Sequence, residues 1–242
     1  MTTAAQSNRP IYIHQISTLR SADTTALFSA MQSECLPAYQ ENGLRLHACW
    51  ETAFGQGPGP EMIEIWELDN FDAHARFLAA AHSPKGDPRI RKWFQRRSEW
   101  ISSSDSMLCL AHPASPTSAE LRAAKARAKV VVHETVHTVP SRQLDYLDTM
   151  YKLWWKPVAQ PGGRTLIGLL YSPWNNRRAI NIWGIGDEWE DVSAAGKGGA
   201  AVGQSGDARA EAFDLWVNQV GHALRDDWTD RFVVPAPFCP IK

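Results

Sequence analysis

The chain repeats one pattern of strands twice, and this repeat constrains its fold more than any other feature. Two pairs of strand-like segments match between the halves: IYIHQIST at 11–18 with VVVHETVH at 130–137, and IEIWELDNF at 63–71 with INIWGIGDEW at 180–189. The offsets agree, because His133 lies 119 residues after His14 and Trp183 lies 117 residues after Trp66. A drift of two residues is the size of an ordinary loop change. We therefore expect two copies of one structural unit.

Hydrophobic periodicity predicts the element order β-α-β-β-α-β in the first half. Asp23 and the pair Asp87–Pro88 are residue types that begin helices, and Asn42–Gly43 are types that end one. The expected strands cover 11–18, 44–54, 61–69 and 106–112, and the expected helices run from Asp23 to Asn42, over 71–82 and from Asp87 to Trp100.

The second half predicts the same order with different connections. Its expected strands cover 130–137, 164–172, 178–186 and 231–236, and its expected helices cover 141–157 and run from Asp207 to Trp228. The small-residue loop GKGGAAVGQSG begins with GKGG at 196–199, which we interpret as a mobile flap. TSAE at 117–120 is a capping box that predicts a short linking helix. The predicted domains are a first repeat over 1–113, a linker over 114–129 and a second repeat over 130–242.

Each predicted unit has a face that its own helices leave bare. A β-α-β-β-α-β unit forms a four-stranded antiparallel sheet with helices on one face, the ferredoxin-like arrangement. The strands here are apolar on both faces, since Ile11 and Ile13 alternate with Tyr12 and Ile16. Apolar area left in water forfeits about 25 cal/mol per Å². The two bare faces are therefore expected to pack against each other.

These segments give the chain a resemblance to a known family. The IYIHQIST strand, WETAFG at 50–55 and the IEIW strand with its acidic turn are similar to NIPSNAP-type members of the dimeric α+β barrel superfamily, with two copies fused. In the second half YSPWNN at 171–176 replaces the pattern of Trp, Thr and Gly. The resemblance implies an α+β fold in which tandem ferredoxin-like βαββαβ repeats form an intrachain dimeric α+β barrel. It also implies the superfamily's activities: lyases, isomerases, polyketide cyclases and haem-degrading or cofactor-free monooxygenases.

Charge and composition argue against several other classes. The 25 Lys and Arg and the 26 Asp and Glu give a net charge of −1, which makes nucleic acid a poor partner. No run approaches the ~18 apolar residues of a membrane span, and the start lacks a signal or transit pattern, so we expect a cytoplasmic protein without a membrane partner. The four cysteines form no CxxC pair, and we expect no metal. A homodimer of the fused pair is left open.

Three residues are candidates for acid–base chemistry: His14, Glu64 and His133. The two histidines occupy equivalent strand positions, and histidine titrates near neutral pH. Glu64 shares a strand face with Trp66, where the barrel interior is expected, and burial raises the pKa of a carboxyl group toward neutrality. We expect His14 and Glu64 to act together. The alternatives are a hydrogen-bonded core histidine and a carboxylate held in an ion pair.

The eleven tryptophans are the other conspicuous feature, since large planar side chains suit both a core and a pocket for flat ligands. Trp154 and Trp155 point about 100° apart on a helix, so one of them is expected to line a groove. Tyr146 could supply a phenol group to the same cavity. The predicted substrate-binding residues are Tyr12, Trp50, Trp66, Tyr151, Trp154, Trp155, Tyr171, Asn181 and Trp183.

These observations predict a cofactor-independent enzyme, a lyase, isomerase or cyclase, that acts on a hydrophobic, aromatic small molecule by His/Glu acid–base chemistry. Two alternatives stay open. One is a monooxygenase of haem or of an aromatic substrate, with haem as the cofactor in the first case. The other is a binding protein for a hydrophobic small molecule, without catalytic activity.

Overall fold

The computed structural model describes residues 9–53, 59–194, 197, 202 and 206–241. The chain divides into a first unit, Met1–Cys109 with Pro235–Pro240, and a second unit, Leu110–Val234 with Ile241–Lys242. The predicted boundaries at 113 and 130 stay a prediction, as does the packing of the two bare faces. The predicted flap at 196–199 lies, apart from Lys197, outside the described residues.

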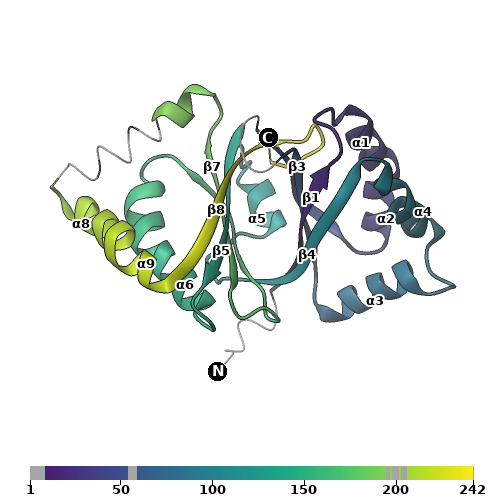
Figure 1. The fold of residues 1–242 in the computed structure, drawn as a ribbon, viewed down its shortest axis with the longest axis horizontal. Coiled ribbons are helices and arrows are strands. Elements are labelled where there is room, and N and C mark those ends of the chain that lie inside the picture. Colours follow the sequence, from purple (N-terminus) through teal and green to yellow (C-terminus); the bar gives the residue numbers. More distant parts are fainter. Residues whose placement is uncertain (1–8, 54–58, 195–196, 198–201, 203–205, 242) are drawn as a thin grey trace. The chain divides into compact units, whose positions relative to one another are not determined.

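The first unit has the predicted order of elements. Its strands are β1 (Ile11–Leu19), β2 (Arg45–Thr52), β3 (Glu61–Leu68) and most of β4 (Ile101–Ala111). Its helical segments are α1 (Thr25–Ala30), η2 (Met31–Cys35), α2 (Leu36–Glu41), α3 (Phe71–His82), α4 (Pro88–Arg96) and η3 (Arg97–Glu99). Strand β3 pairs antiparallel with both β1 and β2. Figure 1 shows helices α1 to α4 on one side of β1 and β4.

Local sequence explains where these helices begin and end. Asp87 accepts a hydrogen bond from the Arg89 N–H and Pro88 is the first residue of α4, as predicted. Helix α2 ends at Glu41, and Gly43 follows with a φ of +87°, a conformation that favours glycine. The first helix begins at Thr25, two residues after the predicted cap.

The second unit repeats this order. Its strands are β5 (Val130–Thr138), β6 (Thr165–Tyr171), β7 (Arg178–Gly186) and β8 (Arg225–Pro235). Its helical segments are α5 (Ser118–Ala123), α6 (Gln143–Met150), η4 (Tyr151–Ala159), α8 (Ala208–Asp214), η5 (Leu215–Val220) and α9 (Gly221–Leu224). Strand β5 pairs with β7 and β8, and β6 pairs with β7 and the end of β4. Figure 1 shows α6, α8 and α9 on one side of β5 and β8.

The predicted helix from Asp207 to Trp228 is wrong in its last turn. Asp207 caps the helix as expected, but the helix ends at Leu224, and Arg225 has extended backbone angles of φ −130° and ψ 140°. Strand β8 begins there, and Trp228 pairs with Val136 of β5. The physical reason is that this edge of β5 needs a hydrogen-bonding partner, and strand pairing supplies it.

The helix predicted from the capping box is confirmed as α5, which belongs to the second unit. The Thr117 side chain accepts a hydrogen bond from the Glu120 N–H, and the Glu120 side chain accepts one from the Thr117 N–H, so both bonds of the predicted capping box form. The four cysteines are buried and form no disulfide with one another, as expected for small apolar side chains.

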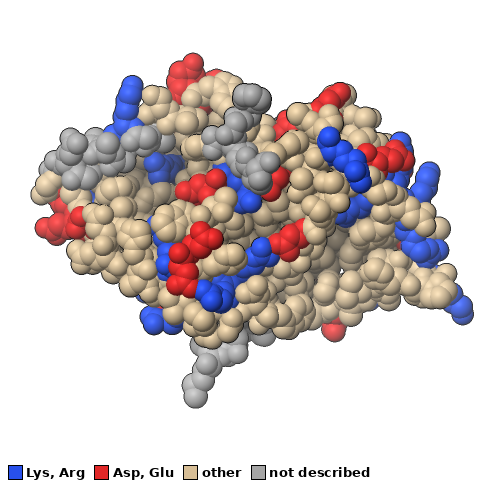
Figure 2. All heavy atoms as spheres, in the orientation of Figure 1, with Lys and Arg blue, Asp and Glu red and all other residues tan. Residues whose placement is uncertain are grey.

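The surface mixes both signs of charge. On the face drawn in Figure 2, Lys and Arg side chains are interspersed with Asp and Glu side chains. None of the helices in the described part of the chain has the length and apolar character needed to cross a bilayer. The cytoplasmic location stays a prediction.

Candidate active site

The register of the first unit separates His14 from Glu64. Strand β1 pairs with β3 so that Gln15 lies opposite Glu64 and His14 lies opposite Ile65. Cross-strand partners share a face, whereas neighbours along a strand point to opposite faces. His14 and Glu64 therefore lie on opposite faces, and the expectation that they act together is wrong.

Glu64 lies on the face that the helices cover, together with Trp66. The Trp66 ring lies 4.8 Å from the Tyr39 ring of α2, between ring centroids. The expectation that Glu64 faces the barrel interior is therefore wrong, because alternation shows which residues share a face but not which face the helices take. Its carboxylate accepts hydrogen bonds from Gln15 Nε2 at 3.0 Å and Trp66 Nε1 at 3.3 Å. Burial raises the pKa of Glu64, and the charge of Arg97 partly opposes this effect.

The second unit holds a denser polar cluster around Glu134 of β5. Asn181 of β7 lies opposite it and its Nδ2 donates to Glu134 Oε2 and to the Tyr146 hydroxyl, both at 2.7 Å. The Tyr146 hydroxyl donates to the Glu134 carboxylate at 3.3 Å. Arg225 Nη1 donates to Glu134 Oε1 at 2.9 Å. Val136, two residues along β5, packs in the helix-side apolar core with Tyr146, so the whole cluster lies between sheet and helices.

The surroundings of Glu134 raise the pKa of its carboxyl group to a value near neutral pH. Burial is the largest cause and, with the negative charge of Asp230 opposite it on β8, raises the pKa of Glu134 to about 7. The hydrogen bond from Asn181, the charge of Arg225 and the hydrogen bond from Tyr146 act in the other direction. A carboxyl group with this pKa can take or give a proton at physiological pH.

Two atoms of the cluster lack a partner. Asn181 Oδ1 and Arg225 Nε are buried and form no hydrogen bond with any described residue. Buried polar groups are normally satisfied by protein or by an ordered molecule. One acceptor and one donor beside Glu134 are thus available to a water molecule or a ligand.

Aromatic rings surround the guanidinium group. Arg225 Cζ lies 3.7 Å from the centroid of Trp228 and 5.5 Å from that of Trp216. The Trp216 ring in turn lies 5.5 Å from the Tyr146 ring. Cation–π contacts of this kind hold a guanidinium in place without consuming its N–H donors.

A pocket of about 650 Å³ opens elsewhere in the second unit. It is lined by α5 and the residues after it, by the π-helical segment η4 and by the start of β6. Tyr151, Trp155 and Arg164 are among its lining residues. Trp155 also belongs to the apolar core cluster that contains Tyr146 and Trp216. The π-helical turn is notable because such turns are frequent at functional sites.

The remaining predicted residues are distributed over several environments. His14 and His133 are buried, and His133 points to the face opposite Glu134, since the two are neighbours on β5. Trp50 is fully buried, and its indole nitrogen has no hydrogen-bond partner in the described part of the chain. Tyr171, Trp154 and Trp183 pack in the helix-side core of the second unit.

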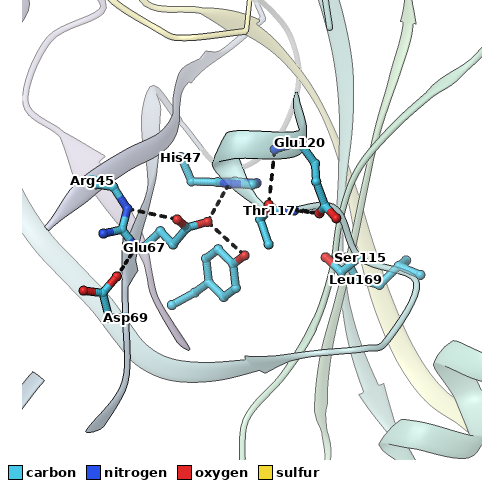
Figure 3. Close-up of polar contacts among 9 residues, drawn as sticks. Arg45, His47, Glu67, Asp69, Ser115, Thr117, Glu120 and Leu169 are labelled. Atoms are coloured by element: carbon cyan, nitrogen blue, oxygen red, sulfur yellow. Dashed lines mark hydrogen bonds and ion pairs between the residues drawn. The ribbon is translucent and has the colours of Figure 1, made fainter. Parts of the chain in front are cut away.

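Tyr12 belongs to a cluster that the sequence did not reveal. Its hydroxyl donates to Glu67 at 3.1 Å, Arg45 Nε donates to the same carboxylate at 3.0 Å, and His47 Nδ1 lies 4.0 Å from it (Figure 3). Arg45 also forms an ion pair with Asp69, in which Arg45 Nη2 lies 2.7 Å from Asp69 Oδ1. Tyr12 and Glu67 are cross-strand partners on the face that the helices leave bare.

Glu134 and Arg225 were not among the predicted site residues. The repeat itself held a signal for Glu134, because aligning IYIHQIST with VVVHETVH equates Glu134 with Gln15. Arg225 and Arg164 had no such signal, since tertiary packing alone brings them to the cluster and the pocket.

The pocket offers few of the side chains that ligate haem iron. Haem iron is held by His, Cys, Met or Tyr, and among the described residues that line the pocket only Tyr151 is of these types. The pocket therefore fits haem poorly. Within the described ranges no group of three or more His, Cys, Asp or Glu is placed to hold a metal ion.

No protein-family model matches the chain, and no curated protein does. Solved structures are similar in fold. A putative monooxygenase from Fusobacterium nucleatum is 7% identical, with 95% of this chain and 93% of that chain covered and a TM-score of 0.61. An anthrone oxidase-like protein is 10% identical, with 95% and 92% covered and a TM-score of 0.57. A NIPSNAP family protein from Agrobacterium tumefaciens is 20% identical, with 45% and 91% covered and a TM-score of 0.36.

The full-length likenesses show the fold. The chain has the α+β fold of tandem ferredoxin-like repeats found in dimeric α+β barrel proteins, which confirms the predicted fold class. NIPSNAP proteins are among the similar structures, over less than half of this chain. The full-length neighbours carry the names putative monooxygenase, anthrone oxidase-like protein and putative chlorite dismutase, and a monooxygenase is one of the alternatives left open by the sequence.

Proposed function

We propose that this protein is an enzyme that removes a proton from a hydrophobic, aromatic small molecule, with Glu134 as the general base. The observation that carries the proposal is the buried Glu134 carboxyl group, whose pKa burial raises to about 7. A base with a pKa near the working pH is both deprotonated often enough and strong enough to act. The cationic Arg225 beside it can offset the negative charge that the substrate acquires.

The pocket of the second unit supports the substrate side of the proposal. Its volume of about 650 Å³ falls within the range of ligand sites. Tyr151 and Trp155 offer flat surfaces for an aromatic ring. Because Trp155 also belongs to the core cluster of Tyr146, we propose that a shift of its ring lets the reacting end of the substrate reach Glu134.

The proposed overall reaction is oxygenation without a cofactor. Glu134 takes a proton from an activated methylene group, and the resulting carbanion reduces O2 and forms a C–O bond with it. Glu134 returns the proton to give a hydroperoxide. Loss of the second C–H proton then breaks the O–O bond, so that CH2 and O2 become C=O and H2O. The balance needs no external reductant, and the names putative monooxygenase and anthrone oxidase-like protein, which two of the full-length neighbours carry, favour this outcome.

The same first step serves a lyase, an isomerase or a cyclase, which would not consume O2. His133 has no part in the proposed step, because it points to the face of β5 opposite Glu134, and His14 has none because it belongs to the first unit. The tests below therefore measure substrate loss and oxygen uptake separately.

The testing experiment compares Glu134→Gln with the wild type on aromatic ketones that carry an acidic methylene group. The variant is expected to lose at least about 100-fold in kcat, with unchanged circular dichroism. Glu211→Gln makes the same change on the exposed side of α8 and is expected to leave the rate unchanged. Product, substrate and dissolved oxygen are followed together.

The possible results of this experiment distinguish the candidate functions from one another. Turnover without oxygen uptake would replace oxygenation by a lyase, isomerase or cyclase reaction. Equal rates for Glu134→Gln and wild type would refute Glu134 as the base, and a large loss in Glu64→Gln instead would move the base to the first unit. Tight binding without any turnover would leave the non-catalytic binding protein as the explanation.

A further inference from the structure

Helix α5 ends at the pocket with a lysine in a strained conformation. Lys125 has a φ of +50°, the left-handed region that disfavours residues with a side chain. The N–H of Lys125 donates to the Arg122 carbonyl at 3.0 Å, and the N–H of Ala126 donates to the Leu121 carbonyl at 2.9 Å. These two bonds form a Schellman motif, in which the position of Lys125 is usually glycine. Strain of this kind is found where a side chain has a functional task.

Lys125 lines the pocket together with Arg127 and Arg164. Neither Lys125 nor Arg127 forms an ion pair with a described residue. Arg164 is half-buried, and its Cζ lies 5.1 Å from the centroid of the Trp154 ring. Three guanidinium or ammonium groups thus converge on one cavity.

The lining of the pocket carries these three cations and two acidic residues, Glu120 and Asp187. Glu120 Oε2 accepts hydrogen bonds from the Thr117 N–H at 2.7 Å and the Thr117 hydroxyl at 2.9 Å, and Figure 3 shows the two side chains facing each other. Asp187 is exposed to solvent. The Glu120 carboxylate is therefore held by the helix cap, and the lining contains one more cationic than acidic side chain.

We infer that this pocket binds an aromatic carboxylate, with Tyr151 and Trp155 against the ring and Lys125, Arg127 and Arg164 around the anion. The inference rests on the proposed function for its claim that such a molecule is the substrate. Carboxylates pair well with guanidinium groups, and Arg164 is half-buried while Lys125 and Arg127 are exposed at the mouth of the pocket. An aromatic phenolate presents a related anion, so the test includes one.

The test titrates the full chain with anthraquinone-2-carboxylate, its neutral amide and a hydroxyanthraquinone, and follows tryptophan fluorescence at two salt concentrations. The carboxylate is expected to bind at least about tenfold more tightly than the amide, and less tightly at high salt. Lys125→Gly and Lys125→Asn are expected to weaken carboxylate binding about tenfold and to leave amide binding unchanged. Arg122→Ala, on the same helix but outside the pocket lining, is the matched control and is expected to bind as the wild type does.

The melting temperature gives a second readout, which is expected to change in the opposite direction to the affinity for the carboxylate. Lys125→Gly relieves the positive φ, so its Tm is expected to rise by about 2–4 °C while affinity falls. A lysine with a merely structural task would give a lower Tm and unchanged binding, which would overturn the inference. Equal affinity for the carboxylate and the amide would overturn it too, and tighter binding of the hydroxyanthraquinone would replace carboxylate by phenolate.

The two proposals can fail separately. Glu134→Gln is expected to bind the carboxylate as the wild type does. Charge-dependent binding without turnover would contradict the proposed function alone, whereas turnover of neutral ketones without any preference for the anion would contradict the carboxylate site alone.

Discussion

The two units hold a carboxylate and a carboxamide together across equivalent strands, with the two groups exchanged. In the first unit Gln15 of β1 donates to Glu64 of β3 at 3.0 Å. In the second unit Asn181 of β7 donates to Glu134 of β5 at 2.7 Å. The repeat equates Gln15 with Glu134 and Glu64 with Asn181. The two units thus share a hydrogen-bonded pair with one acid, and they differ in which strand carries that acid.

The surroundings of the two acids differ more than the pairs themselves. Glu134 has a direct ion pair with Arg225 at 2.9 Å, and both side chains are nearly buried, at 6% and 11% exposure. The Glu64 carboxylate accepts a hydrogen bond from Trp66 Nε1 at 3.3 Å. Arg97 donates its hydrogen bond to Ser104 and affects the pKa of Glu64 only through its charge. The second unit therefore compensates its buried charge directly, and the first unit does so weakly.

Removing the two arginines tests this difference and has the largest expected effect. Arg225→Met leaves Glu134 without its ion pair, and breaking a buried pair in this way costs about 3–5 kcal/mol of unfolding free energy. Arg97→Met is the matched change in the first unit and is expected to cost less than about 1 kcal/mol. Urea denaturation at pH 8, above the pKa of Glu134, gives both values.

The loss in Arg225→Met is expected to shrink at pH 5, where Glu134 is protonated and needs no cation. Equal losses for the two variants at pH 8 would show that the units compensate their acids alike, and the comparison would fail.

The sequence predicted the repeat, the fold class and most elements because these depend on local patterns. The IEIW and INIW strands, the Asp87–Pro88 start and the TSAE capping box each act through neighbours in the chain. The site depends on register and on the choice of face, which alternation leaves undetermined. His14 and Glu64 were paired for this reason, although Gln15 is the residue opposite Glu64.

Long-range contacts account for the rest. The sequence predicts Arg225 inside a helix. Pairing with the edge of β5 instead makes Arg225 the first residue of β8, where its side chain donates to Glu134. Lys125 carried no signal, because a strained φ follows from how α5 ends and not from residue type. Prediction from sequence thus succeeded for elements and failed for side chains that meet only after packing.

The pH dependence of stability is the next largest expected effect. Burial raises the pKa of Glu134 from its ordinary 4.5 to about 7, so between these values the folded chain keeps a proton that the unfolded chain has lost. Unfolding free energy should therefore fall as pH rises through this window, by about 3 kcal/mol in total, and stay level above it. Chemical denaturation of the wild type and Glu134→Gln at several pH values measures the difference.

Comparing the wild type with Glu134→Gln separates the titration of Glu134 from that of all other groups. A stability difference between wild type and Glu134→Gln that is the same at pH 5 and pH 8 would contradict the raised pKa. Glu64→Gln provides the comparison for the first unit, where burial also raises the pKa of the acid.

Exchanging the groups of the second unit gives the smallest expected effect and tests the shared pair most directly. Asn181→Asp sets a second carboxylate against Glu134 in place of a 2.7 Å hydrogen bond, so it is expected to cost about 2 kcal/mol at pH 8 and less at pH 5, where one group is protonated. The double variant Glu134→Gln with Asn181→Asp places the amide and the acid as in the first unit. It is expected to recover most of the loss, because the pair again has one donor and one acceptor. A double variant no more stable than Asn181→Asp would mean that the position of the acid matters beyond the pairing, and the equivalence of the two units would be limited to their backbone.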